Sequence, residues 1–241
     1  MTHVALVTNV RQFGGPGSAA ALAGLGLHVA VHDATFTDDD VRRAHEAAHV
    51  GHSAHAEQDP ENLVAAVLAR HGRLDVLVAN DIAPFASSFA DADASQYRDL
   101  LEALAVTPFR LAKAAVGQML ERGSGCLIFV TSAAAKRPIP GTALYAAARA
   151  ATVALAAALP RELWGSAIQV NAIGPHWLAN PTYFAPGWDD DPRRREGFER
   201  EVPMQRLGTQ EELGALVAML ASGTVAPLTG QFLGFSCGWL P

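Results

Sequence analysis

The stretch Val4-Ala5-Leu6-Val7-Thr8-Asn9-Val10-Arg11-Gln12-Phe13-Gly14-Gly15-Pro16-Gly17 decides the fold of this chain. A short apolar run followed by a glycine-rich segment is typical of a buried strand that leads into a helix at a dinucleotide site. Glycines are needed there because a Cβ would clash with the pyrophosphate. In the spacing Thr-Gly-x3-Gly-x-Gly, the glycine positions fall on Asn9, Phe13 and Gly15. Two of the three carry side chains, so we expect the fold to be kept and the cofactor loop to be blocked.

Short apolar runs alternate with helical patterns along the rest of the chain. We expect strands near residues 4–8, 28–32, 53–56, 75–79, 126–131, 168–173 and 231–234, and helices near 18–25, 38–48, 60–71, 95–122, 142–163, 193–201 and 209–221. This alternation predicts the α/β class, as a single Rossmann-like domain over residues 1–241 with a doubly wound parallel sheet of about seven strands and helices on both faces. Thr37 and Ser95 are expected to cap helices, and Pro108 to kink one.

Composition excludes several classes of partner. The chain has 241 residues, half of them apolar, and a formal net charge of -6, without the basic patch that nucleic-acid binding requires. The apolar run Val4–Val7 is too short for a signal peptide or a membrane span, so we expect no membrane partner. Of the two cysteines, Cys126 lies in an apolar run and is expected to be a buried thiol rather than half of a disulfide. These features are typical of a cytoplasmic protein.

Several residues that suit a ligand site stand just after predicted strands. In an open parallel sheet, ligands bind beyond the carboxyl ends of the strands. We therefore expect one cleft to bring together Phe13, Asp33, Asn80, Asp81, Ser132 and Pro175.

Ser132, Tyr145 and Arg149 form the candidate catalytic set. Tyr145 and Arg149 are four residues apart in a predicted helix, so they share one helix face. A free tyrosine, with a pKa near ~10, is a poor base at neutral pH. A fixed positive charge lowers the pKa of a phenol, and arginine keeps its charge in any protein environment. We therefore expect Arg149 to favour a Tyr145 phenolate that acts as general base, while the Ser132 hydroxyl binds a substrate oxygen.

With these motifs the chain resembles the short-chain dehydrogenase/reductase superfamily over nearly its whole length, and within it the cofactor-independent halohydrin dehalogenases. The resemblance rests on Thr8-x4-Phe13-Gly14-Gly15 and on Ser132-x12-Tyr145-x3-Arg149. The segments 80–82, 174–178 and 205–210 add to it. The two motifs together are specific, whereas neither would be alone.

The chain departs from the ordinary reductases of that superfamily at several positions. They have a lysine where this chain has Arg149, and a catalytic asparagine in the helix region near Leu104, which here contains none. They also carry Asn-Asn-Ala-Gly where residues 79–82 read Ala-Asn-Asp-Ile. The loop over residues 178–184 is shorter than the dehalogenase pattern, and the chain stops soon after Trp239, which bears on substrate range rather than on the reaction.

The resemblance implies a lyase reaction that needs no cofactor and no metal. Tyr145 would remove the proton of a vicinal haloalcohol while Ser132 holds the oxygen. The alkoxide would then displace halide from the neighbouring carbon and form an epoxide. In reverse, Tyr145 would protonate an epoxide that halide, azide, cyanide or nitrite opens.

The resemblance also implies a halide or nucleophile pocket where nicotinamide sits in the reductases. Backbone N–H groups of His176, Trp177 or Leu178, after the sixth strand, would donate to the anion. Asp81 belongs to this region, where it would orient Arg149 or the loop rather than touch halide. Carried over residue by residue, the pocket contains Phe13, Asp81, Pro175, His176, Trp177 and Leu178, with Ala134 and Phe184 as the substrate pocket.

Two alternative functions stay open. Asp33 ends the second strand, where NAD enzymes place the acid that binds the ribose, so an NAD(P)-dependent oxidoreductase with an atypical loop is one. We favour a structural role for Asp33, because aspartate is also an ordinary turn residue and Phe13 occupies the loop. A non-catalytic binding or scaffold member of the superfamily is the other.

Two further features have weaker implications. His45, His49, His52 and His55 suggest a metal site, but they lack a His-Glu-x2-His pattern, so we interpret them as solvated surface.

The alanine-rich helix over residues 142–163 and the helix before it offer flat apolar faces. Related folds pair such helices, so we expect a homo-oligomer, specifically a homotetramer.

Overall fold

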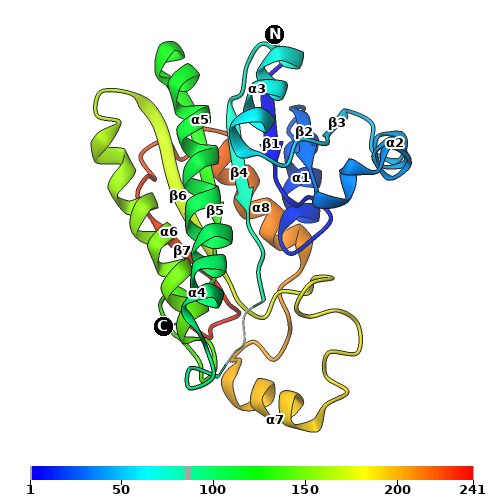
Figure 1. Cartoon of the computed structure of the whole chain (residues 1–241), viewed down its shortest axis with the longest axis vertical. Coiled ribbons are helices and arrows are strands. Elements are labelled where there is room, and N and C mark those ends of the chain that lie inside the picture. The colour runs from blue at the N-terminus through cyan, green and yellow to red at the C-terminus, as the bar shows by residue number, and fades with distance from the viewer. Residues whose placement is uncertain (1, 85–87, 241) are drawn as a thin grey trace.

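Seven parallel strands form one sheet in a computed structural model that describes residues 2–84 and 88–240. The strand order is β3-β2-β1-β4-β5-β6-β7, as the ribbon in Figure 1 shows. The strands are β1 (Val4–Val7), β2 (His28–His32), β3 (His52–His55), β4 (Val76–Asn80), β5 (Ser124–Val130), β6 (Ala167–Pro175) and β7 (Phe232–Phe235). The predicted single Rossmann-like α/β domain is confirmed.

Helices cover both faces of the sheet (Figure 1). They are α1 (Gly15–Gly24), α2 (Asp39–Ala48), α3 (Pro60–His71), α4 (Ala94–Leu101), α5 (Thr107–Arg122), α6 (Ala143–Glu162), α7 (Pro192–Glu201) and α8 (Gln210–Ala221). Apolar side chains of α3, α5 and α6 form one core cluster against the sheet, and those of α1 and α8 form a second. The central strands β1, β4, β5 and β6 are mostly buried because the sheet lies between these two clusters, whereas the edge strand β7 is only partly buried.

The chain adds β2 and β3 on one side of β1 and then adds β4 to β7 on the other side, so the strand order reverses between β1 and β4. Ala5 of β1 pairs with Val29 of β2 on one side and with Val76 of β4 on the other. The crevice beyond the carboxyl ends of the strands at such a reversal is where open α/β sheets bind ligands. The loop after β1, the end of β5 and the start of α6 lie on this side of the sheet.

The helix predicted over residues 95–122 is three elements rather than one. It begins at Ala94, where Asp93, and not the predicted Ser95, is the cap and forms a capping box with Gln96. A π-helical turn over Glu102–Val106 separates α4 from α5 just before Pro108. Pro108 has no N–H for the carbonyl of Leu104, and the Thr152 hydroxyl of α6 donates to that carbonyl instead, at 2.6 Å. The predicted kink is therefore a π-turn that anchors α5 to α6.

Two other expectations about helix ends were wrong. Asp38, not Thr37, caps α2, because its carboxylate accepts from the N–H groups of Asp40 and Val41. Helix α1 begins at Gly15, three residues before the predicted start, since Pro16 suits a first helical turn.

Helix α6 is long and apolar enough to cross a membrane by length and composition. It is a core helix of this fold, because Val153 and Ala156 belong to the cluster that packs on the sheet. Its alanines let it approach β5 and β6 closely, which brings Tyr145 and Arg149 to the edge of the sheet.

Candidate active site

Ser132, Tyr145 and Arg149 meet at the carboxyl end of β5. Ser132 follows the strand and accepts the N–H of Ala134 at 3.2 Å, which leaves its hydroxyl proton free to point elsewhere. Tyr145 and Arg149 lie one turn apart on α6, and both side chains are buried. Ser132 and Tyr145 line a cavity of about 360 Å³. Ser132 and Tyr145 therefore face one cavity, and Arg149 is buried next to Tyr145.

Arg149 supplies a fixed positive charge beside Tyr145. Only 1% of its surface is exposed, and its guanidinium donates to the carbonyls of Val130 at 3.2 Å and Asp81 at 2.8 Å. Its Cζ lies 5.1 Å from the centre of the Tyr145 ring. Burial lowers the pKa of Arg149, but the negative charge that Tyr145 and Tyr183 can carry outweighs it and holds that pKa above its ordinary value. The group stays a cation whose position is set by main-chain atoms.

A second phenol, Tyr183, was missed by the sequence reasoning. It lies on the loop after β6, is hydrogen-bonded to Tyr145, and donates to the carbonyl of Ala83 at 2.9 Å. Burial, followed by the charge of Tyr145, raises the pKa of Tyr183 to about 12. Tyr183 therefore stays protonated at neutral pH. Its place in a loop rich in proline and aromatic residues was the only signal in the sequence.

The loop after β1 keeps the backbone of a glycine turn at two positions where the glycine is replaced. Asn9 and Phe13 have φ values of +46° and +47°, a region that glycine adopts freely and other residues rarely do. The Phe13 ring is buried, lines the cavity and meets the Tyr183 ring edge to face at 5.3 Å. The predicted block is thus an aromatic side chain that forms part of the cavity wall.

Side chains from distant segments occupy the N–H groups of this loop. The N–H of Phe13 donates to Thr182 Oγ1 at 2.9 Å, that of Gly14 to Asn80 Oδ1 at 3.1 Å, and that of Gly17 to Gln210 Oε1 at 3.0 Å. In a dinucleotide-binding fold, the amides at this helix N-terminus hold the pyrophosphate. A Cβ built on Gly17 would lie 2.1 Å from the carbonyl oxygen of Gln210. These residues do not fit a dinucleotide phosphate.

The remaining predicted residues divide into two groups. The cavity is lined by Phe13, Ala134, Pro175, His176, Trp177, Leu178 and Phe184, together with Trp188, Arg193 and Trp239, which the sequence reasoning did not name. His176 stacks on Trp239 with ring centres 4.1 Å apart, and burial, helped by Arg137, lowers its pKa to about 4. Asp81 does not line the cavity. It is buried beside Arg149, and desolvation raises its pKa to about 7 although Arg149 opposes the shift.

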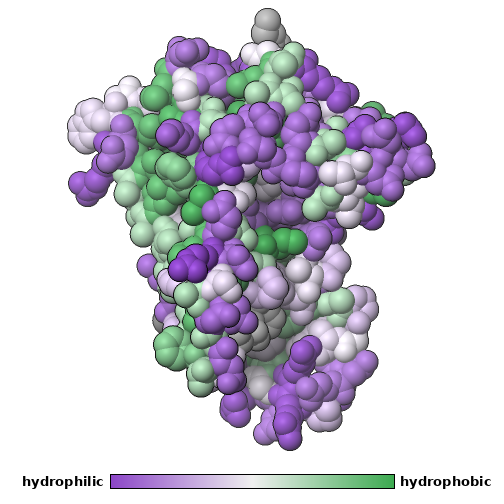
Figure 2. Space-filling model, viewed as in Figure 1, coloured by the Kyte–Doolittle hydropathy of each residue, from purple (hydrophilic) through white to green (hydrophobic). Residues whose placement is uncertain are grey.

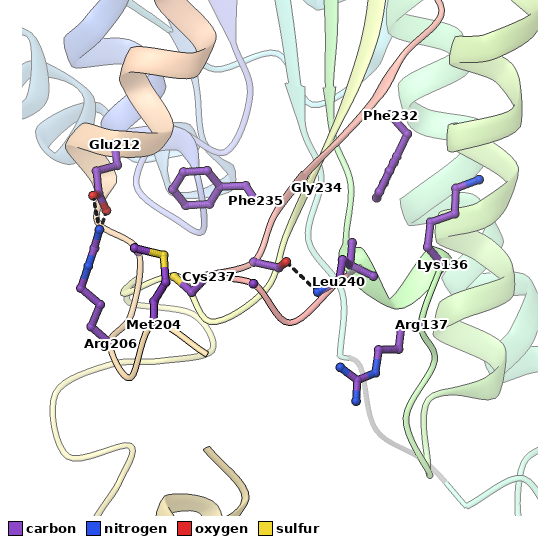
Figure 3. A pocket seen from close by; sticks show the side chains of 13 residues that line it. Lys136, Arg137, Met204, Arg206, Glu212, Phe232, Gly234, Phe235, Cys237 and Leu240 are labelled. Atoms are coloured by element: carbon purple, nitrogen blue, oxygen red, sulfur yellow. Dashed lines mark hydrogen bonds and ion pairs between the residues drawn. The ribbon is translucent and has the colours of Figure 1, made fainter. Parts of the chain in front are cut away.

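A larger hollow beside β7 holds none of the catalytic set. Figure 3 shows Phe232, Phe235 and Leu240 around it, with Arg206 paired to Glu212 at its edge. Its lining does not include Ser132 or Tyr145. The smaller, aromatic cavity is therefore the candidate active site.

Known proteins are similar in sequence to this chain over most of its length. A family profile described as Enoyl-(Acyl carrier protein) reductase matches residues 15–239. Dehydrogenase/reductase SDR family member 4 of Bos taurus is 30% identical over 239 residues, covering 95% of this chain and 84% of the relative. The chain belongs to the short-chain dehydrogenase/reductase superfamily.

Within this superfamily the chain is similar to solved halohydrin dehalogenases. One structure, titled a dehalogenation enzyme, has a TM-score of 0.94 and 36% identity and covers 99% of this chain and 98% of its own. A halohydrin dehalogenase bound to ethyl (2S)-oxiran-2-ylacetate has a TM-score of 0.93 and 41% identity and covers 98% and 96%. The resemblance drawn from the two sequence motifs is confirmed.

Asp33 shows how the chain uses a position that the superfamily's NAD enzymes give to the cofactor ribose. Its carboxylate accepts from the N–H and hydroxyl of Thr35, at 3.1 and 2.7 Å, and from the N–H of Arg11 at 3.3 Å. It caps the short 3₁₀ helix Ala34–Thr37. Asp33 therefore has the turn and capping contacts that the structural interpretation predicts.

Proposed function

We propose that this chain converts vicinal haloalcohols into epoxides with release of halide, and opens epoxides with halide, azide, cyanide or nitrite in the reverse direction, without a nicotinamide cofactor. One observation carries the proposal. The amides that would hold a dinucleotide are engaged by Thr182, Asn80 and Gln210, while Ser132 and Tyr145 face a cavity beside a buried cation. The set can move a proton but has no place for a hydride donor.

The reaction follows from the roles of the three residues. Ser132 donates a hydrogen bond to the substrate hydroxyl oxygen while the Tyr145 phenolate, stabilised by Arg149, accepts its proton. The oxygen then forms a bond to the neighbouring carbon as the carbon–halogen bond breaks, and the bonding pair leaves with the halide. The products are an epoxide, a halide ion and a protonated Tyr145, which returns its proton to solvent. Tyr183 orients the Tyr145 hydroxyl through their hydrogen bond.

The leaving halide is proposed to lie against the loop after β6. Of the three amides predicted to donate, that of His176 is already engaged by the Phe235 carbonyl at 2.9 Å. Within residues 2–84 and 88–240, no protein acceptor is recorded for the N–H groups of Trp177 and Leu178, and the buried Trp177 indole N–H also has no hydrogen-bond partner. Three unengaged donors beside the apolar Phe13 and Pro175 suit a weakly hydrated anion.

We propose further that the enzyme works as a cytoplasmic homotetramer. Apolar side chains of the α5 region remain exposed, with Phe109 at 44% and Leu120 at 47%. Figure 2 shows hydrophobic surface over this side of the molecule. Cys126 and Cys237 are free thiols, which suits a reducing compartment. Light scattering after size exclusion should give four times the chain mass of 25.3 kDa, and a monomer would contradict the tetramer.

Halide release from 1,3-dichloro-2-propanol, with no nucleotide added, tests the proposal. We expect steady chloride release from the wild-type chain and none from Tyr145→Phe. Release that persists in the variant would contradict the role of Tyr145. Absence of release together with saturable NADH or NADPH binding would instead support an oxidoreductase, the activity that the names of several relatives describe.

A further inference from the structure

Histidines are concentrated at one edge of the sheet, remote from the cavity. Seven of the nine histidines of the chain lie on or beside β2, α2, β3 and α3, namely His28, His32, His45, His49, His52, His55 and His71. This edge carries α2 and β3, on the side of the molecule away from α6 and β7 (Figure 1). The proposed dehalogenation uses none of them.

Three of these side chains form a compact group that the interpretation as solvated surface did not foresee. His45 lies near the end of α2, His49 directly follows the helix, and His52 begins β3. Their rings stack with centres 4.2 to 5.4 Å apart, and one nitrogen from each lies within 4.8 Å of the others. His55 is not part of the group, since it is buried and faces Glu57.

One nitrogen separation in the group fits the bond lengths of a transition-metal ion. Two ligands about 2.0–2.1 Å from a tetrahedral ion lie roughly 3.3 Å apart. His45 Nε2 and His52 Nδ1 are 3.1 Å apart, close to that value. The His49 nitrogen lies within 4.8 Å of the other two, and His49 is exposed, so an ion can reach the group from solvent.

A hydrogen bond fixes which ring nitrogen of His49 is free to bind a metal. Its Nδ1 donates to the carbonyl of His45 at 2.9 Å, which leaves the lone pair of Nε2 available. Metal-binding histidines commonly donate their second ring N–H to a carbonyl in this way. The contact between His45 Nε2 and His52 Nδ1 requires one shared proton, and an ion between the two nitrogens would replace it.

Burial is the main effect on the charge of two of the three rings, those of His45 and His52. Burial, followed by the charges of His45 and His49, lowers the pKa of His52 to about 4. Burial also lowers the pKa of His45, with His49 and Arg11 lowering it further and Asp33 and Glu46 opposing them. His28 adds to the depression at His52. Neutral imidazole is the form that binds a metal, although the positive charge of Arg11 opposes any cation.

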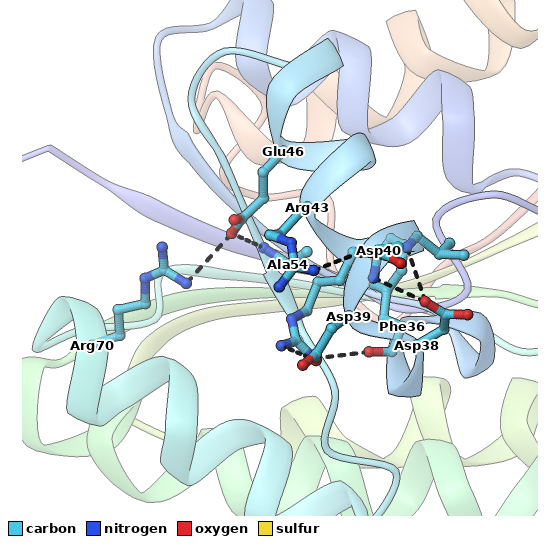
Figure 4. Close-up of polar contacts among 10 residues, drawn as sticks. Phe36, Asp38, Asp39, Asp40, Arg43, Glu46, Ala54 and Arg70 are labelled. Carbon is cyan, nitrogen blue, oxygen red and sulfur yellow. Dashed lines mark hydrogen bonds and ion pairs between the residues drawn. The ribbon is translucent and has the colours of Figure 1, made fainter.

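The backbone that carries the three histidines is fixed without a metal. Figure 4 shows Glu46 of α2 accepting the N–H of Ala54 in β3 at 2.8 Å and lying 3.5 Å from Arg70 of α3. Helix α2 is therefore already tied to β3 and α3 beside the cluster. An ion would meet a preformed site rather than order a loose one.

We propose that His45, His49 and His52 bind one divalent transition-metal ion of the zinc, nickel or copper class and so clamp the end of α2 to β3. Imidazole nitrogen is a preferred ligand of these metals, and no carboxylate is needed for a three-histidine site with water in the fourth position. The ion would be structural, because the cluster lies at the sheet edge away from the cavity.

The test uses the full chain without an affinity tag, stripped with a chelator and titrated with Zn²⁺ by calorimetry. We expect one ion per chain and a rise in the melting temperature on binding. His49→Ala should weaken binding by at least about tenfold. It should leave the metal-free melting temperature nearly unchanged, because the side chain is exposed. His3→Ala, an exposed histidine outside the cluster, is the matched control and should bind Zn²⁺ like the wild-type chain.

A second metal and a second variant keep the proposal open to refutation. Co²⁺ bound by three imidazoles and water should give visible absorption bands of a four-coordinate ion, and His45→Gln/His52→Gln should remove them. No binding of Zn²⁺ at one equivalent, or binding that is unchanged in both variants, would overturn the site. Chloride release by the metal-free chain should be unaffected, so failure of the metal site and failure of the dehalogenase proposal are distinguishable.

Discussion

The two walls of the cavity differ in whether their hydrogen-bonding groups are free to bind a ligand. The wall built by β5 and α6 presents Ser132 and Tyr145 to the cavity, with Arg149 behind Tyr145 held by main-chain carbonyls. The wall built by the loop after β1 has its donors occupied by Thr182, Asn80 and Gln210. Under the proposed function, the first wall carries out proton transfer, while the amides of the second wall that would hold a phosphate are engaged by side chains. Different elements of the fold carry these two walls, so one can change without the other.

Removing the phenol from the first wall is expected to have the largest effect. Tyr145→Phe should lower chloride release from 1,3-dichloro-2-propanol by at least about 100-fold, because general base catalysis contributes ~10²–10⁴-fold. The melting temperature should change little. Tyr97→Phe removes the one tyrosine outside the cavity and should keep full activity. An equal loss of chloride release in both variants would contradict a specific role of Tyr145.

Removing the aromatic block from the second wall should affect stability more than chemistry. Phe13→Ala deletes a buried ring at the edge of a core cluster and should lower the free energy of unfolding by about 3–5 kcal/mol. It should not create NADH binding, because the loop amides stay engaged. Denaturant unfolding measures the first effect and fluorescence titration with NADH the second. Phe89→Ala, at a phenylalanine that is 76% exposed, should have a small effect, and NADH binding by the Phe13 variant would show that the ring alone closes the site.

The buried carboxyl of Asp81, beside Arg149, makes the free energy of unfolding depend on pH. The pKa of Asp81 is about 7 in the folded chain and about 3.9 when unfolded, so the folded state retains a proton that the unfolded state loses. Stability from this group is fully present below about pH 4 and is lost as the pH rises to about 7, on the order of a few kcal/mol. Asp81→Asn should therefore flatten the fall in unfolding free energy between about pH 4 and pH 7. An unchanged slope would show that Asp81 is ionised in the folded protein.

The smallest effect is expected where the two walls touch. Tyr183→Phe removes the hydrogen bond to Tyr145 while keeping the ring that packs on Phe13. A hydrogen bond worth about 1 kcal/mol predicts a loss of about fivefold in kcat with little change in KM. The pH profile of kcat should shift as well, because the group acts on Tyr145 rather than on substrate. A change in KM alone would assign Tyr183 to substrate binding instead.

Sequence reasoning predicted the parts of this molecule that depend on local pattern. The strands follow from apolar runs, and the shared face of Tyr145 and Arg149 follows from helical spacing. The engagement of the loop could not be predicted, because Thr182 and Gln210 are 169 and 193 residues from the amides that they accept. The π-turn before Pro108 likewise depends on Thr152 of another helix. The histidines meet only because the short turn over residues 49–51 brings the end of α2 next to the start of β3.

Arg149 has one further consequence. Its guanidinium donates to the carbonyl oxygens of Val130 and Asp81, and it is also hydrogen-bonded to Tyr145. Carbonyl dipoles fix where the charge lies without cancelling it. Folding therefore creates in advance an electric field that points from the protein interior toward Tyr145. Any anion that forms in the cavity during a reaction enters a field that solvent would otherwise have to build by reorienting around it.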